Sequence, residues 1–392
     1  MTVVEDTATL EAFREEVRAW LEENYPAELR KNPSKEQVLQ WIGLLADKGW
    51  TVPTWPKEYS GGGLSRLQDR IINEELGRMG CRRDYLAGQG VTMIGPTLLV
   101  HGNEEQKMAH LPKIARGLSH WCQGYSEPGA GSDLASLQMR AEDNGDYFLV
   151  NGSKIWTSGA DVSDWIFCLV RTDQNVGKHQ GIGFLLVDMS DPGVTVEPIV
   201  LISGQSPFCE TRIEDVKIPK SNLVGEMDGG WTIAKDLLTF ERNMIAGSQG
   251  GSSAPAQKVD PMITEARKYV GPAEGKLSDP FMRDAITQQL MDEQAMALAL
   301  KHFNDELKIG AAPGAKASMF KYLGSEVGKR RYETQLKFGG TQYLGWEGED
   351  FTPADLGVTR GWLRSRAYSI EGGTTEIQHN VVAKRVLTLP MS

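Results

Sequence analysis

The sequence predicts an α+β protein in which helical regions at both ends flank a central antiparallel β-domain. Three observations support this: helical periodicity in the N-terminal third, short strand-like runs from about residue 120, and helical periodicity again from Gly229 onward. Because helices and strands are segregated along the chain, the order argues against an alternating parallel sheet. We therefore expect a helical domain over 1–120, a β-domain over 121–228 and a helical domain over 229–392.

Each region has its own local pattern. Apolar residues of the N-terminal third recur at the spacing of one helix face: Phe13, Val17, Trp20 and Leu21, then Ile72, Leu76 and Met79. The strand-like runs of the central region are 147–150, 165–170, 184–187, 194–196 and 211–213. Asn144-Gly145 and Asn151-Gly152 are turn signals beside these runs. The stretch 247–261, rich in Gly, Ser and Pro, predicts a loop between long helices.

Composition and charge exclude several classes of protein. At 392 residues, with 40% hydrophobic and 24% charged residues, the chain can bury a large core and has an ordinary globular composition. The net charge of −10 argues against nucleic acid as the main partner. Apolar runs such as 165–170 are too short to cross a bilayer. Residues 1–10 are polar and acidic without a signal pattern, so we expect a cytoplasmic protein with no membrane partner.

Cysteine and histidine usage predicts neither disulfides nor a metal site. The four cysteines are widely scattered and form no Cys-x-x-Cys pair, which favours unpaired thiols in a reducing compartment. The six histidines are equally dispersed and lack the spacing of metal ligands.

Two long motifs in the central region indicate a cofactor site. Residues 123–133 read Gln-Gly-Tyr-Ser-Glu-Pro-Gly-Ala-Gly-Ser-Asp, and residues 151–159 read Asn-Gly-Ser-Lys-Ile-Trp-Thr-Ser-Gly. Glycines let a backbone approach a ligand closely, tryptophan offers a flat stacking face, and serine hydroxyls can bond a ring edge. Taken singly, the motifs are also compatible with a glycine-rich hairpin loop and a core tryptophan. Together and in this order, they resemble the flavin-binding loops of the acyl-CoA dehydrogenase family.

The resemblance implies the family's architecture, with a C-terminal four-helix bundle after the β-domain, and FAD as cofactor. The residues of the two motifs that it implies as flavin contacts are Tyr125, Ser126, Gly131, Ser132, Trp156 and Ser158. Among these, Trp156 and Ser158 are expected against the isoalloxazine ring, and Ser132 also at the start of the acyl pocket.

A third motif lies near the C-terminus, where residues 370–378 read Ile-Glu-Gly-Gly-Thr-Thr-Glu-Ile-Gln. It resembles the family's C-terminal element and implies Thr374 and Glu376 as flavin contacts; the alternative is a capped surface helix. Gly339 and Gly340 resemble the family's Phe-Gly-Gly segment, through which a neighbouring subunit helps hold the ADP half of FAD. Leu336 departs from the family there, because that position often carries Gln.

The catalytic base has moved relative to most of the family. Most members place a carboxylate immediately before Gly-Thr of the C-terminal motif, and this chain has Gly372 there, with Glu371 one residue earlier. A minority of members carry the base in a Glu-Arg pair on a helix of the C-terminal domain. Glu241-Arg242 matches that pair.

Periodicity supports Glu241 independently of the resemblance. Glu241 shares an apolar helix stripe with Ala234, Leu238 and Ile245. Burial raises the pKa of a glutamate towards neutrality, which suits a general base. The alternative is a structural Glu-Arg ion pair inside the bundle. The resemblance implies Glu241 as the catalytic residue and Arg242 and Gly372 as substrate contacts, with the Gly372 amide facing the thioester oxygen.

The function that the resemblance implies is FAD-dependent α,β-dehydrogenation of an acyl-CoA thioester to the trans-2-enoyl-CoA, with electrons passed to an electron-transfer flavoprotein. The small residue at Gly372 favours a bulky, branched or steroid side-chain substrate. The implied assembly is a homo- or heterotetramer. Two alternatives stay open: an acyl-CoA oxidase or flavin monooxygenase on the same fold, or a subunit that shares the FAD site of a heteromeric dehydrogenase.

Overall fold

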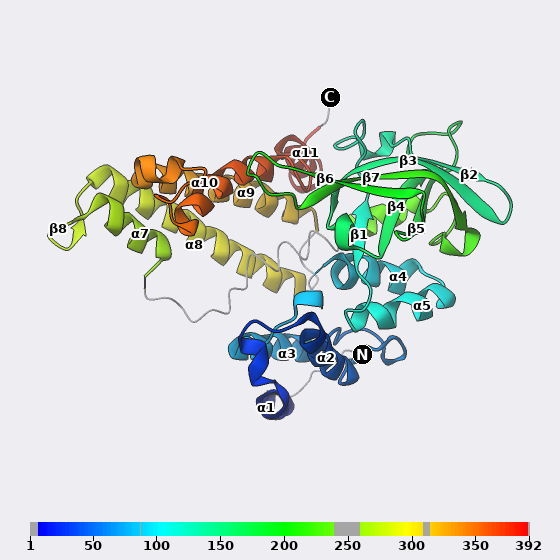
Figure 1. The fold of residues 1–392 in the computed structure, drawn as a ribbon, viewed down its shortest axis with the longest axis horizontal. Helices are drawn as coiled ribbons and strands as arrows, with labels where there is room; N and C mark the ends of the chain where they lie inside the picture. The colour runs from blue at the N-terminus through cyan, green and yellow to red at the C-terminus, as the bar shows by residue number, and fades with distance from the viewer. Residues whose placement is uncertain (1–6, 87, 239–258, 309–313, 391–392) are drawn as a thin grey trace. The chain divides into compact units, whose positions relative to one another are not determined.

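The computed structural model describes residues 7–86, 88–238, 259–308 and 314–390. These residues form two compact units, which are described separately. The first unit comprises 7–199 and 207–238, and the second comprises 200–206 with the described residues from 259 onward. Figure 1 shows α1 to α5 and the large sheet in the first unit, and α7 to α11 in the second. The α+β fold class is confirmed, while most of the predicted loop 247–261 lies outside the described residues.

The N-terminal region is helical, as predicted. Its helices are α1 (Thr7–Asn24), α2 (Lys35–Asp47), α3 (Arg66–Met79), α4 (Gly95–His101) and α5 (Glu104–Ala115). Helix α3 illustrates how the sequence sets these bounds. The Ser65 hydroxyl accepts the Gln68 N–H while the Gln68 side chain accepts the Ser65 N–H, which satisfies the first amides of the helix. Gly80 ends it in the left-handed region, at φ 66°.

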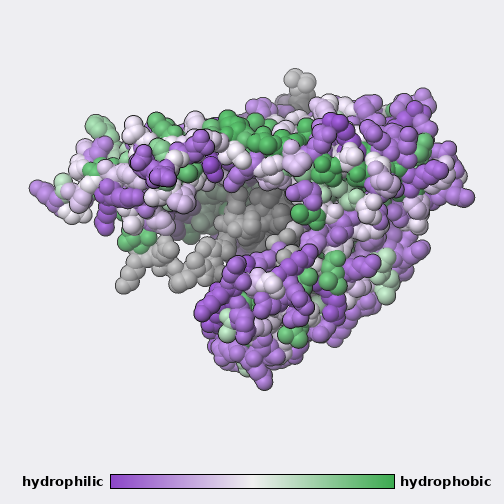
Figure 2. Space-filling view, viewed as in Figure 1, coloured by the Kyte–Doolittle hydropathy of each residue, from purple (hydrophilic) through white to green (hydrophobic). Residues whose placement is uncertain are grey.

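The predicted apolar helix face forms the core of α1, α2 and α3. Val17, Leu21, Ile72 and Leu76 are all at most 1% exposed, and Trp41 of α2 packs in the same cluster. Phe13, Trp20 and Met79 are partly buried against it. On the face drawn in Figure 2, the surface over these helices is mainly hydrophilic, as expected for amphipathic helices that turn their apolar side inward.

The central region is a β-sheet domain whose pairing is mixed and not wholly antiparallel as predicted. Its strands are β1 (Trp121–Gly124), β2 (Arg140–Asp143), β3 (Tyr147–Ser158), β4 (Trp165–Arg171), β5 (Ile182–Asp188), β6 (Val194–Ile199) and β7 (Phe208–Pro219). Strands β2–β3, β3–β7, β7–β6 and β4–β5 pair antiparallel. Strand β1 pairs parallel with β4, from Trp121 opposite Trp165 to Gly124 opposite Cys168. The long connection between β1 and β4 permits this crossover.

Strand β4 reads as a continuous apolar run because it is buried on both faces. Phe167 and Leu169 join a core that includes Leu98 of α4 and Ile114 of α5. The alternate residues of β4, such as Cys168, join a second core made of sheet residues. The helical residues 230–238, which follow the sheet, pack against the first of these cores. They contribute Ile233, Ala234 and Leu237 to it.

The second unit is mainly helical, which confirms the helical C-terminal domain. Its elements are α7 (Pro261–Val270), the short strands β8 (Pro272–Ala273) and β9 (Lys276–Leu277), α8 (Pro280–Lys308), α9 (Ala317–Gly339), α10 (Pro353–Ser365) and α11 (Thr375–Val381). Helix α9 is the central element, since α7, α8, α10 and α11 all contact it.

The described ranges lack two further features. None of their helices combines the length and apolar character needed to cross a bilayer. In the same ranges, no three His, Cys, Asp or Glu side chains are grouped as ligands for a metal ion.

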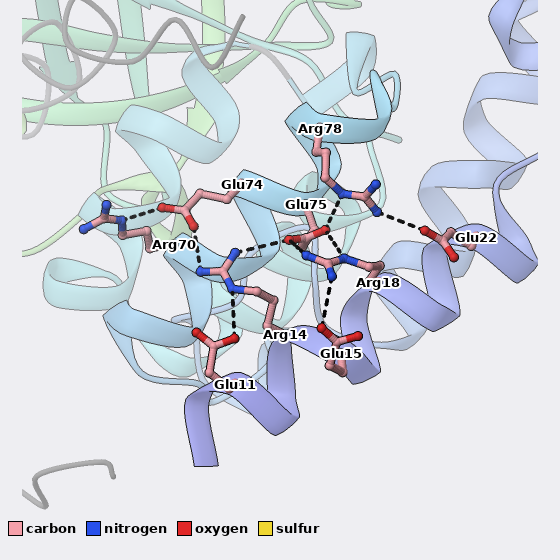
Figure 3. Close-up of polar contacts among 9 residues, drawn as sticks. All are labelled: Glu11, Arg14, Glu15, Arg18, Glu22, Arg70, Glu74, Glu75 and Arg78. Carbon is pink, nitrogen blue, oxygen red and sulfur yellow. Dashed lines mark hydrogen bonds and ion pairs between the residues drawn. The ribbon is translucent and has the colours of Figure 1, made fainter. Parts of the chain in front are cut away.

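A buried carboxylate ties α1 to α3. Figure 3 shows Glu75 of α3 at the centre of a network of arginines and glutamates. Glu75 accepts hydrogen bonds from Arg14 Nη1 at 3.2 Å and from Arg18 Nε at 3.1 Å, both on α1, and from Arg78 Nε at 2.6 Å. Its side chain is 3% exposed, whereas that of neighbouring Glu74 is 38% exposed. Burial alone raises the pKa of Glu75, but the hydrogen bonds from the arginines outweigh it and lower this pKa to about 2.

We predict that Glu75→Gln lowers the free energy of unfolding by about 1.5–3 kcal/mol at neutral pH, because it removes charge-assisted hydrogen bonds at a buried site. Glu74→Gln is the matched control on the same helix, and its loss should stay below about 1 kcal/mol because Glu74 is solvated. Urea denaturation of both variants measures this difference.

The same pair of proteins tests the pKa. With a folded pKa of about 2, the Glu75 contribution is fully present above the ordinary glutamate range near 4.5 and is lost as pH falls towards 2. The stability difference between wild type and Glu75→Gln should therefore shrink over that interval. A difference that is constant with pH, or equal effects of the two variants at neutral pH, contradicts the role of Glu75.

Candidate functional site

A buried ion pair joins the two motif loops of the first unit. Lys154 Nζ of β3 lies 2.8 Å from Glu127 Oε1 of the 123–133 segment, and their side chains are 0% and 7% exposed. The same ammonium donates to the carbonyl oxygen of Tyr125 at 3.2 Å. Burial lowers the pKa of Lys154, and the Glu127 carboxylate opposes that shift. The two motifs, 27 residues apart at this pair, are thus fixed to each other.

The remaining lone pairs of Glu127 are also used. Its carboxylate accepts the backbone N–H groups of Gln138 at 2.6 Å and Met139 at 2.9 Å. The backbone N–H of Glu127 donates to the Ala130 carbonyl, and the Ala130 N–H donates to the Glu127 carbonyl. These two hydrogen bonds close the turn that contains Pro128 and Gly129. A buried carboxylate is tolerated only when it is paired and fully hydrogen-bonded, and Glu127 meets both conditions. The sequence could have indicated this pair, because Lys154 lies an even number of residues after the buried Phe148 and Val150 of the same strand. That spacing places a lysine on the inward face of the strand.

Trp156 projects outward beside this pair. The register of β3 against β7 shifts between Lys154 and Thr157, which marks a bulge, and Trp156 in the bulge has φ 62°. Its side chain is 52% exposed and contacts Phe208 edge-on, with ring centroids 6.0 Å apart. Thr157 turns inward, and its hydroxyl donates to the Cys209 carbonyl at 2.8 Å. The bulge therefore holds a large indole ring on the surface, in a backbone conformation that bulky residues rarely adopt.

The other predicted contacts of the first unit lie in different surroundings. Ser126 is half-buried, and its carbonyl accepts the Ile155 N–H at 2.9 Å, directly before Trp156. Gly131 and Ser132 are exposed just after the turn. The Tyr125 ring, however, is packed in the core against Phe167 and Phe184.

A cavity of about 280 Å³ borders Ser158 at the end of β3. Residues from three segments line it, among them Gln89, Gly90, Ser119, Trp121, Ser158 and Ser163. All of these segments belong to the first unit.

These features of the first unit fit a flat aromatic cofactor. The half-exposed indole of Trp156 offers a stacking face. A Cβ built on Gly131 meets no atom within 4 Å, so that loop leaves room for a ligand. Ser158 is among the residues that line a neighbouring cavity.

The C-terminal motif lies in the second unit and is built on two left-handed glycines. Gly372 has φ 60° and Gly373 has φ 89°. Lys321 Nζ donates to the Gly373 carbonyl at 2.7 Å, and Gln378 Nε2 donates to the Gly372 carbonyl at 3.0 Å. Both carbonyls are therefore held from behind by side chains of α9 and α11.

The predicted flavin contacts of this motif begin α11. The Thr374 hydroxyl accepts the Ile377 N–H at 3.3 Å and caps the helix, as its sequence position predicts. Glu376 lies in the first turn, and hydrogen bonds from its own N–H and from Thr374 lower its pKa. Gly339 and Gly340 lie at the end of α9. A Cβ on Gly339 would come within 2.1 Å of the Tyr343 ring, whereas one on Gly340 would meet no atom within 4 Å.

Of the two candidate bases, the structure describes only Glu371. Glu371 forms an ion pair with Arg364 of α10, at 2.7 Å between Oε2 and Nη2. Glu241 and Arg242 lie outside the described residues. Of the apolar stripe that contains Glu241, Ala234 is 1% exposed and Leu238 packs against the same core.

We predict that Lys154→Met costs about 3–5 kcal/mol of folding stability, because it leaves the Glu127 carboxylate buried without a cation. Lys178→Met is the matched control, since the Lys178–Asp133 pair joins the same motif segment at 2.9 Å but is exposed to solvent. That control should cost less than about 1 kcal/mol. The double variant Glu127→Gln/Lys154→Met should recover part of the loss. Urea unfolding measures the stability of each variant. Equal losses of stability in the two lysine variants would show that the buried pair has no special role.

Comparisons with known proteins agree along most of the chain. Three family models match: the acyl-CoA dehydrogenase N-terminal domain over residues 7–118, the middle domain over 122–216 and the C-terminal domain over 228–387. The acyl-CoA dehydrogenase IpdE1 of Mycobacterium tuberculosis is 34% identical over 394 residues, covering 97% of this chain and 98% of the relative.

Solved structures show the same likeness. The Tcur3481–Tcur3483 steroid ACAD matches with a TM-score of 0.75 and 30% identity over 99% of both chains. The ChsE4–ChsE5 complex from Mycobacterium tuberculosis matches with a TM-score of 0.72 and 28% identity, over 99% of this chain and 100% of that one. With matching motifs, matching domain order and relatives that align from end to end, the chain belongs to the acyl-CoA dehydrogenase family, whose members are FAD-dependent oxidoreductases that act on CH–CH groups.

Proposed function

We propose that this acyl-CoA dehydrogenase converts a saturated acyl-CoA thioester into its trans-2-enoyl-CoA with Glu241 as the base. When bound, FAD supplies the acceptor for the hydride that leaves the β-carbon. The chain's own task is to hold the thioester against that acceptor, remove the α-proton and stabilise the negative charge that develops on the thioester oxygen. The observation that carries the proposal is the half-exposed Trp156 in its bulge, with Ser158 beside a cavity.

The backbone of the C-terminal motif supports moving the base to Glu241. At φ 60°, position 372 favours glycine, so a carboxylate side chain there would strain the backbone. Glu371 is held in an ion pair with Arg364, which directs its side chain at α10. In the sequence, Glu241 continues an apolar stripe whose described members Ala234 and Leu238 face a hydrophobic core.

The remaining groups have the following proposed roles. Trp156 and Ser158 face the isoalloxazine ring, and Ser126, Gly131 and Ser132 line the adjoining loop, with Ser132 also at the acyl pocket. Tyr125 can take part only through its backbone or phenol oxygen, because its ring is in the core. Thr374 and Glu376 contact FAD from the start of α11, and Gly339 and Gly340 contact the ADP half. Arg242 and the Gly372 amide bind the thioester.

We infer a bulky substrate of the steroid side-chain type, with an electron-transfer flavoprotein as electron acceptor. Two features support the substrate class: the missing side chain at Gly372, and the likeness to a structure described as a steroid ACAD. The matching Tcur3481–Tcur3483 and ChsE4–ChsE5 structures each pair two different chains. That pairing favours a mixed assembly in which this chain and a second subunit share the FAD sites.

We predict that Glu241→Gln retains FAD but slows flavin reduction by about 10²–10⁴-fold or more, because a general base contributes that much. Glu371→Gln is the matched control and should change the rate by less than about tenfold, since Glu371 is ion-paired and outside the proposed chemistry. The measurement is anaerobic stopped-flow absorbance with a thioester substrate, after the visible spectrum has shown equal FAD content. Near-wild-type reduction by Glu241→Gln, or a large loss in Glu371→Gln alone, would reject Glu241 as the base.

A further inference from the structure

Lys321 of α9 holds the backbone on both sides of Gly372. Its ammonium donates to the carbonyl oxygen of Tyr368 at 2.9 Å and to that of Gly373 at 2.7 Å. The first of these residues precedes Gly372 and the second follows it. An ammonium carries three donors and no acceptor, which suits it to bridging two carbonyl oxygens. The path of the backbone around Gly372 is therefore tied to one side chain of a neighbouring helix.

Two further side chains hold the same turn. Ser325 Oγ, on the same helix as the lysine, donates to the Tyr368 carbonyl at 2.8 Å. Gln378 Nε2 donates to the carbonyls of Gly372 at 3.0 Å and Gly373 at 3.2 Å. Both glycines have left-handed φ values, and glycine has more backbone conformations open to it than any other residue. The side-chain bonds select one of these conformations.

The arrangement holds the carbonyl oxygens of the turn and leaves the Gly372 N–H available. Within the described ranges this N–H has no hydrogen-bond partner, and Gly372 is exposed. A backbone N–H lies in its peptide plane, so it keeps its direction only while the planes around it are fixed. A donor that stabilises a developing oxyanion has to be aimed at the place where the charge forms, which makes that direction important for catalysis.

The bonds of Lys321 are costly if their purpose is stability alone. The side chain is half-buried, and burial lowers its pKa. Among the described residues it forms no ion pair, because Glu371 is paired with Arg364 at 2.7 Å and the Glu371 and Glu376 carboxylates act on the ammonium only from a distance. Neutral carbonyls compensate a desolvated cation less well than a carboxylate does. This use of a lysine indicates that the geometry of the turn matters.

We propose that Lys321 is a positioning residue for the dehydrogenation, and that it acts through the Tyr368 and Gly373 carbonyls to keep the Gly372 N–H aimed at the thioester oxygen. The inference rests on the proposed function, in which this amide stabilises the negative charge that develops as the α-proton leaves. Lys321 affects that charge through the backbone. A displacement of about 1 Å can cost about 100-fold in rate, so a loosened turn should weaken the stabilisation strongly.

The test measures how well the site stabilises the enolate, without completing the reaction. The probe is (cyclohexylthio)acetyl-CoA, in which sulfur replaces the β-carbon, so the α-proton can leave but there is no β-hydrogen to leave as hydride. A pH titration of the FAD-loaded protein with this probe gives the pKa of the bound α-proton, read from the long-wavelength absorbance of the enolate beside oxidised flavin. Lys321→Met should raise that pKa by about one unit or more, which is a tenfold or greater loss of enolate.

Lys329→Met is the matched control. It removes the same charge from the same helix, but the Lys329 ammonium pairs with Glu326 at 2.7 Å on α9 itself. The pKa of the bound α-proton should therefore change by less than about 0.3 unit. Ser325→Ala is a milder second variant, because it removes one donor to the Tyr368 carbonyl and keeps the lysine. It should raise the pKa of the α-proton by about 0.3–1 unit.

FAD content and probe affinity are recorded for each variant, and both should stay within about threefold of wild type, since the proposed role concerns the enolate and not the binding of the thioester. An α-proton pKa that is unchanged in Lys321→Met, or raised equally in Lys329→Met, overturns the proposal. If Lys321→Met does not fold, an unchanged pKa in Ser325→Ala overturns it. Absence of the enolate band in wild type would instead reject the dehydrogenation itself, so the two failures are distinguishable.

Discussion

The buried pair between Lys154 and Glu127 is the interaction on which the arrangement of the two motif loops depends. It connects the 123–133 segment to β3, and both segments also carry exposed residues. The desolvation of both charges is offset by their mutual bond and by backbone partners on each side: the Tyr125 carbonyl for the lysine, and the Gln138 and Met139 amides for the glutamate. With these loops fixed, the bulge at Trp156 can present an aromatic ring outward without collapsing onto the sheet.

The same arrangement recurs in the second unit, where a lysine holds the backbone of a motif in place. Lys321 of α9 donates to the carbonyls of Tyr368 and Gly373, and burial lowers its pKa. Between these two carbonyls the chain passes through the left-handed glycines, Gly372 and Gly373. Position 372 can then contribute an amide but is a poor place for a carboxylate. A site that keeps this backbone has to take its base from elsewhere in the chain, which is the physical reason for considering Glu241.

The sequence was a good guide wherever periodicity and burial coincide. The apolar positions of 13–21 and 72–79 form the cores of α1 and α3, and each predicted strand run lies within one of β3 to β7. The short strands β1 and β2 were missed, because four residues carry no measurable alternation. The parallel pairing of β1 with β4 was missed as well, since strand partners far apart in sequence leave no local signal.

The motifs singled out Ser126, Trp156 and Ser158 as flavin contacts, which stay a prediction. They did not indicate that the two segments carrying these residues are joined by the buried Lys154–Glu127 pair, which the structure shows. The orientation of Tyr125 could not be read from the motif, because a strand end can turn an aromatic side chain to either face, and here it joins the core.

The most direct test of the whole account is an anaerobic titration of the purified, FAD-loaded protein with saturated acyl-CoA thioesters, followed through the flavin absorbance. We predict that a ring-bearing thioester bleaches the oxidised flavin band and that the trans-2-enoyl-CoA appears in equal amount. A flavin that stays oxidised with every thioester, by this chain alone and together with a second subunit, would contradict the proposed dehydrogenation.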